Sequence, residues 1–145
     1  MKGHSFIDHT ADVGIKVWAD GREALFEEAA SAMLELIVNR ETVQPDINKT
    51  LRLEADNTEK LFLKWLKEIL FILEKFSVVF ATCRVQKIKP SNQTTNKLIL
   101  TAILSGERID PTRHDICTEI KAVTLHDFYL QEHGSVWEAR VLFDI

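Results

Sequence analysis

The stretch "DHTADVGIKVWA" (residues 8–19) runs into "DGREALFEEAASAM" (residues 20–33), and together they predict a strand followed directly by a helix. In the first stretch apolar residues alternate with others, which is the period of a half-buried strand. Apolar residues then recur every three or four positions to about Val38, which is the period of an amphipathic helix. Asp20 and Glu23 have the spacing of a capping box, so the helix is expected to begin here.

The rest of the chain continues this pattern with one more helix and five more strands. The order strand, helix, strand, helix and four strands is typical of an α+β fold. We therefore expect one two-layer domain over residues 1–145, with two helices packed on one face of a largely antiparallel sheet. The further predicted elements are a strand at 50–55, a helix from about 57 to 76, a hairpin of strands at 77–89 and 97–104, and closing strands at 119–130 and 136–145.

Composition narrows the class of protein. The 145 residues are 46% hydrophobic and 28% charged, as in an ordinary folded soluble domain. The net charge of -4 disfavours direct binding to DNA or RNA, which usually needs a basic face. Cys83 and Cys117 form no CxxC pair and are expected to be buried, reduced thiols. With no apolar signal core and no membrane-spanning stretch, we expect a cytoplasmic protein with no membrane partner.

Charged residues near the two chain ends form a candidate cation site. In the last strand Asp144 falls on the more polar face, and the strand period continues to the carboxylate of Ile145. The same parity places Asp12 on the polar face of the first strand. If these two strands are neighbours, three carboxylates cluster, and a bound cation would relieve their repulsion. All-oxygen ligands suit Ca²⁺, Mg²⁺ or Mn²⁺.

The residues alone leave simpler roles open. The aspartates could be solvated charges at strand ends or caps of turns. His9, beside Asp8, could be a hydrogen-bonded structural residue. The irregular segment at 106–117, rich in charge and histidine, is expected to be a functional loop.

Four segments together resemble the archease family, and the resemblance spans the whole chain. They are "DHTADVGIKVWA" (8–19), "EEAASAM" (27–33), "EIKAVTLH" (119–126) and "WEARVLFDI" (137–145). Leu125 stands where family members often have an aromatic residue, a departure that concerns local packing.

The resemblance implies a non-catalytic protein that activates the GTP-dependent RNA ligase of tRNA splicing, promoting guanylylation of the ligase and multiple turnover. It also implies a divalent cation bound by Asp12, Asp144 and the C-terminal Ile145, with Ca²⁺ first among the candidates and Mn²⁺ or Mg²⁺ as alternatives. Lys121 looks functional in the family, although a strand lysine that protects an edge is the commoner role. We place Asp8 and His9 as residues that support the site or contact the partner.

Two other classes of function remain open from the sequence. One is a stand-alone metal-dependent hydrolase or nucleotide-acting enzyme, with His9 or His114 as the base. Against it stands the lack of a glycine-rich phosphate-binding loop, since the chain has only 5 glycines. The other is a general chaperone or scaffold that uses an exposed sheet edge. In the activator hypothesis the partner is the RNA ligase, and RNA is contacted only indirectly.

Overall fold

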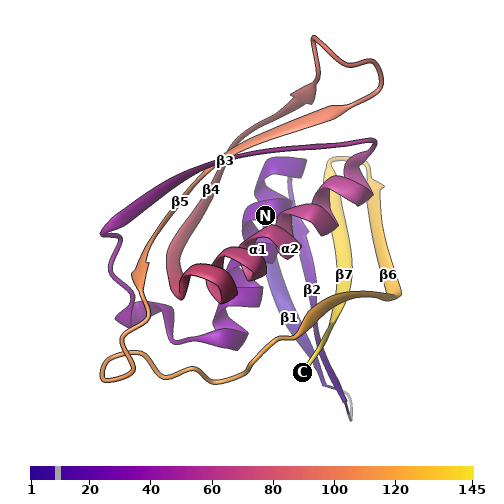
Figure 1. The fold of residues 1–145 in the computed structure, drawn as a ribbon. Coiled ribbons are helices and arrows are strands. Elements are labelled where there is room, and N and C mark those ends of the chain that lie inside the picture. The colour runs from indigo at the N-terminus through magenta and orange to yellow at the C-terminus, as the bar shows by residue number, and fades with distance from the viewer. Residues whose placement is uncertain (9–10) are drawn as a thin grey trace.

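Two helices lie between two antiparallel sheets (Figure 1). The computed structural model describes residues 1–8 and 11–145. Both helices contact both sheets, α1 through β2 and β4 and α2 through β3 and β6. The elements are β1 (Gly3–Asp8), β2 (Asp12–Ala19), α1 (Arg22–Ile37), η1 (Arg40–Thr42), β3 (Ile47–Ala55), α2 (Thr58–Phe76), β4 (Val78–Pro90), β5 (Leu98–Arg108), β6 (Ala122–His133) and β7 (Val136–Asp144).

The prediction of an α+β fold with two helices packed against antiparallel strands is confirmed. The strands divide into two sheets, ordered β1-β2-β7-β6 and β3-β5-β4. The division arises because β3 pairs along its whole length with β5, so the middle of the chain forms its own sheet. β1 was not predicted, because its "GHSFID" sequence shows no regular alternation of apolar residues.

The different sequences of the helices explain how they sit between the sheets. α1 buries residues around most of its circumference, many of them alanines, which lets a sheet approach on either side. α2 is amphipathic, with one buried stripe and one solvated face. The helices meet where the buried Trp65 Nε1 donates a hydrogen bond to the Phe26 carbonyl oxygen at 2.8 Å. Asn57 caps α2, and its side-chain oxygen accepts a hydrogen bond from the Lys60 N–H at 2.8 Å.

Two local predictions are wrong. α1 has Gly21 as its N-cap with no side-chain cap, because Asp20 pairs with the N-terminal ammonium group. Cys117 is exposed, because it follows a single bridge between Val38 and Ile116 and not a regular strand. Cys83 is buried as expected, and burial raises the pKa of its thiol to about 12.

The segment expected to be a functional loop is built around a buried carboxylate. Glu107, near the end of β5, accepts from Gln44 N at 3.1 Å, from Arg113 Nη2 at 2.8 Å and from His114 Nε2 at 2.7 Å. His114 is buried, and its Nδ1 accepts from Asp110 N at 2.9 Å. Both ring nitrogens are therefore engaged, which leaves His114 poorly placed to act as a general base.

Replacing Glu107 with Gln should destabilise the protein at neutral pH. The Arg113 hydrogen bond, with the Gln44 N–H, holds the pKa of Glu107 at about 2, below its ordinary 4.5. A carboxyl with a depressed pKa stabilises the fold above about pH 4.5, and this stabilisation is lost as the pH falls toward 2. Urea unfolding should thus separate wild type from Glu107→Gln at pH 7 and bring them together near pH 2. Asp115→Asn, an exposed change in the same segment, is the control.

Candidate cation site at the chain end

Asp12 and Asp144 face each other across adjacent strands. Asp12 is the first residue of β2 and Asp144 the last of β7, and their Cα atoms are register partners. Register partners in an antiparallel pair project to the same face, with Cβ atoms about 4.5–5.5 Å apart. That face is the outer one, because Ile15 and Val141 on alternate positions lie in the core. Like charges directly opposite each other repel, so this pair favours a bound cation.

Gly14 and Leu142 are the next pair of residues on the same face, two positions along the strands from Asp12 and Asp144. They are register partners, and a Cβ on Gly14 would lie 2.5 Å from Leu142 Cδ2 and 2.6 Å from the Val141 carbonyl oxygen. Leu142 is fully buried although it points away from the main core. The glycine of the DHTADVG sequence thus lets Leu142 lie across β2 and fix the strand ends that carry the two aspartates.

The chain terminus and Lys121 complete this end of the sheet. Ile145 directly follows Asp144, the last residue of β7, and is 44% exposed. The Lys121 N–H donates to the Asp144 carbonyl oxygen at 2.8 Å, and Ala122 is the register partner of Asp144. In Figure 1 the C-terminus lies beside the start of β6. Lys121 is exposed and precedes β6, which begins three residues later than predicted.

The structure separates Asp8 from the aspartate pair. Asp8 is the last residue of β1 and the register partner of Val13, so it projects to the helix side of the sheet while Asp12 projects to the outer side. Asp8 therefore lies at the same end of the sheet but on the opposite face. His9 lies outside the described residues.

The donor set fits a hard divalent cation. Asp12, Asp144 and the terminal carboxylate of Ile145 would supply only oxygen ligands, as Ca²⁺, Mg²⁺ and Mn²⁺ prefer. Over residues 1–8 and 11–145, no group of three or more His, Cys, Asp and Glu side chains is arranged to hold a metal ion. The proposed site accordingly depends on the terminal carboxylate for its third protein ligand.

A cavity of about 330 Å³ lies next to Lys121, which lines it together with apolar residues of the helix layer. This cavity is not predictable from the sequence pattern, because its walls come from three separate segments of the chain. The lining residues are Ile37, Leu70, Leu73, Glu74, Ser77, Ile109, Ile116, Thr118, Glu119, Ile120 and Lys121.

A cationic pair on the same outer face was also missed. Lys16 and Arg140 are register partners, two register rows beyond Gly14 and four residues from the aspartate pair on each strand. Their alternation with Asp12 and Asp144 is visible in the sequence, but only the pairing of β2 with β7 brings them together. A phosphorylated ligand that reached the aspartate pair through a cation would find these cations further along the same strands.

The fold and this strand end together define an α+β protein with two facing aspartates at one end of a sheet. The model of the Archease protein family (MTH1598/TM1083) matches residues 4–145. The chain belongs to the archease family. No helix in the described part of the chain is long and apolar enough to cross a membrane.

Individual relatives agree with this assignment. Protein archease of Methanosarcina mazei is 33% identical over 144 residues, covering 99% of this chain and 97% of the relative. Protein archease of Pyrococcus furiosus is 32% identical over 146 residues, covering 100% of both chains.

Two solved structures share the fold. The solution structure of Methanobacterium thermoautotrophicum protein 1598 superposes with a TM-score of 0.83 at 29% identity, covering 99% of each chain. The crystal structure of a Thermotoga maritima archease, described as a possible chaperone, gives a TM-score of 0.62 at 25% identity and covers 96% of this chain and 94% of that one.

Proposed function

We propose that this protein is a non-catalytic activator of the GTP-dependent RNA ligase of tRNA splicing, and that it acts in the cytoplasm through a divalent cation held at the chain end. The observation that carries the proposal is the direct opposition of Asp12 and Asp144 beside the chain terminus. Such a pair at an exposed strand end has an electrostatic cost in isolation, and a hard cation removes it.

The residues of the site have distinct roles in this proposal. Asp12, Asp144 and the carboxylate of Ile145 would hold the cation, Ca²⁺ first among the candidates, and Leu142 packed on Gly14 keeps the two strand ends fixed. When bound, the cation would supply positive charge for the phosphates of the ligase-bound nucleotide. The Lys121 N–H is held by the Asp144 carbonyl oxygen, which fixes the Lys121 backbone at this end of the sheet, and the Lys121 side chain lines the adjacent cavity on the helix side.

Counting ligation products per ligase molecule tests the proposal. The organism's own ligase, GTP, divalent metal and RNA ends are incubated with and without this protein at substoichiometric amounts. We expect the protein to raise the number of turnovers, and the protein alone to hydrolyse no GTP and join no RNA. Robust GTP hydrolysis by the ligase-free protein would favour the hydrolase hypothesis instead.

Replacing Lys121 with Ala should remove most of the stimulation while leaving the fold intact. The side chain is exposed, and such substitutions usually change stability by no more than about 0.5 kcal/mol. Lys67→Ala, an exposed lysine on α2, is the matched control and should stimulate like wild type. Full stimulation by Lys121→Ala at unchanged stability would remove Lys121 from the proposed partner surface.

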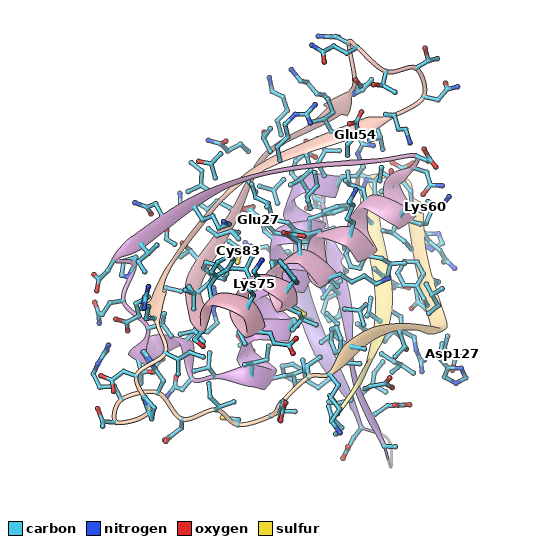
Figure 2. The ribbon with its side chains drawn as sticks, in the orientation of Figure 1. Glu27, Glu54, Lys60, Lys75, Cys83 and Asp127 are labelled. Atoms are coloured by element: carbon cyan, nitrogen blue, oxygen red, sulfur yellow. The ribbon has the colours of Figure 1, made fainter. Side chains whose placement is uncertain are left out.

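A general chaperone is the second candidate, suggested by the Thermotoga maritima relative's description as a possible chaperone. The supporting observation is the edge strand β6, whose pairing with β7 is interrupted between Thr124 and Tyr129 and which exposes 67% of Leu125. Figure 2 shows Asp127 projecting away from the ribbon in this interruption. A chaperone using that edge would keep its activity in Asp144→Asn, whereas the proposed activator would not.

A further inference from the structure

The sheet β3-β5-β4 has an inner face packed on the helices and an outer face made of the alternate residues. The Ser105 hydroxyl donates to Asn48 Oδ1 at 2.6 Å, which shows that register partners share this outer face. Most of these side chains are exposed or half-buried, and Ile99 is buried. The outer-face residues are Asn48, Thr50, Arg52 and Glu54 on β3, Thr82, Arg84, Lys87 and Lys89 on β4, and Ile99, Thr101, Ile103 and Ser105 on β5.

Four of the outer-face residues are cations. Arg52, Arg84, Lys87 and Lys89 share these positions with one carboxylate, Glu54. The next carboxylate along this side of β5, Glu107, is buried and already paired with Arg113 and His114. Within residues 1–8 and 11–145, none of the four forms an ion pair with a carboxylate of the protein. The whole chain carries a net charge of -4, so this face is locally opposite in sign to the molecule. A positive patch of this kind attracts polyanions.

A β-bulge gives β4 its row of outward cations. The register with β5 shifts between Val85 and Lys87, so Gln86 is an extra residue. Without this insertion, the side-chain alternation would turn Lys87 and Lys89 toward the helices. With it, Ile88 is buried and both lysines point outward beside Arg84.

The same face is hollowed at the end where the β4–β5 turn begins. A hollow of about 460 Å³ has Arg52 on one side and Lys89 on the other, with hydroxyl and amide groups between them. Its lining residues are Arg52, Lys89, Ser91, Asn92, Gln93, Ile99 and Thr101. Cations flanking neutral hydrogen-bonding side chains are the groups that most often contact phosphate and ribose oxygens.

We propose that the outer face of β3-β5-β4 binds the phosphate backbone of RNA. Protein partners are usually held by buried aromatic or large apolar anchors, and the outer face as defined above includes no aromatic residue. Arginine, lysine, serine, threonine and asparagine side chains instead match the sequence-independent contacts made to nucleic-acid backbones. The choice of RNA over DNA rests on the proposed function, whereas the binding of a phosphate backbone does not.

Fluorescence anisotropy of labelled single-stranded RNA, measured with the full-length protein alone, tests this inference. The test variant is Arg84→Gln/Lys87→Gln/Lys89→Gln. The matched control, Lys60→Gln/Lys67→Gln/Lys75→Gln, removes the same charge from the solvated side of α2, where Figure 2 shows Lys60 and Lys75 near the two ends of the helix. DNA of the same sequence and polyglutamate are the competitors. No ligase is present, so the outcome is independent of the proposed activator role.

We expect wild type and control to bind RNA at physiological salt with a dissociation constant of about 10⁻⁴–10⁻⁶ M, and the sheet variant to bind at least about tenfold more weakly. The slope of log affinity against log salt should become less steep by about 2 in the sheet variant, since each lost phosphate contact to a single strand contributes about 0.7.

Equal weakening of both variants, or no binding by wild type at about 100 μM, would overturn the inference. Stronger competition by polyglutamate than by unlabelled RNA would overturn it too, and would point to an acidic protein partner. DNA competing as well as RNA would keep the backbone site and remove the preference for RNA. Should the triple variant misfold, amide shifts of wild type on RNA titration must still concentrate in β4 and β5.

Discussion

Trp65→Ala is expected to lower the free energy of unfolding by about 3–5 kcal/mol, a large part of the stability of a small domain. Trp65 is fully buried on α2 between the two helices, and its indole donates to the Phe26 carbonyl oxygen. Alanine would leave a cavity between layers that the two sheets hold apart, so the surroundings have little freedom to close it. Urea unfolding followed by circular dichroism measures the loss.

Trp65→Phe separates packing from hydrogen bonding. Phenylalanine keeps most of the apolar contact but leaves the Phe26 carbonyl oxygen without its indole donor, so a smaller loss of about 1–3 kcal/mol is expected. Phe71→Ala on the same helix, where the side chain is 50% exposed, is the control and should change stability little. A loss in Trp65→Ala no larger than in the control would show that the helices do not meet as described.

Asp144→Asn is expected to have opposite effects on stability with and without cation. In the metal-free protein, removing one of two facing charges should stabilise the fold by about 0.2–1 kcal/mol. Wild type should gain about 2.7 kcal/mol when Ca²⁺ is present at about 100 times its dissociation constant, and the variant should gain far less under the same conditions.

Thermal unfolding with EDTA and with Ca²⁺ measures both effects. Asp12→Asn should behave like Asp144→Asn, because the two residues are register partners. Asp20→Asn, an exposed carboxylate at the other end of β2, is the control and should keep the full gain from Ca²⁺. A gain from Ca²⁺ in the Asp144 variant equal to that of wild type would contradict the proposed ligand set.

Regular apolar periodicity is what made most of the fold predictable. α2, with its single buried stripe, and β7, with its strict alternation, were predicted within a few residues. Gly134, which lies between the strands predicted at 119–130 and 136–145, has a positive φ of 65° in the turn that joins β6 to β7. The arrangement in two sheets was not predictable in the same way, because strand alternation shows which face is buried but not which strand is the neighbour.

The part of the site that depends on the alternation of side chains along a strand was predictable. Parity placed Asp12 and Asp144 on polar faces, and the observed register sets them opposite each other. Parity alone did not separate Asp8 from this pair, because the hairpin register between β1 and β2 decides which face Asp8 takes. The Lys16–Arg140 pair required the same knowledge of register.

Net charge was a poor guide to local charge. The value of -4 argued against direct contact with nucleic acid, yet the outer face of β3-β5-β4 concentrates cations. The bulge at Gln86 has no clear signature in the sequence, and without it Lys87 and Lys89 would not share a face with Arg84. The charge on each face of the molecule, and not only the net charge of the chain, therefore has to be known before nucleic-acid partners are excluded.

Calorimetric titration of Ca²⁺ into the protein with and without a short C-terminal extension shows whether the carboxylate of Ile145 is a cation ligand. A peptide bond after Ile145 converts the terminal carboxylate into a neutral carbonyl, while the same extension at the N-terminus leaves all three proposed ligands intact. We expect the C-terminally extended form to lose more than about tenfold in Ca²⁺ affinity, with its secondary structure retained, and the N-terminally extended form to bind like wild type. Equal Ca²⁺ binding by both extended forms would show that the carboxylate of Ile145 is not a ligand of the cation.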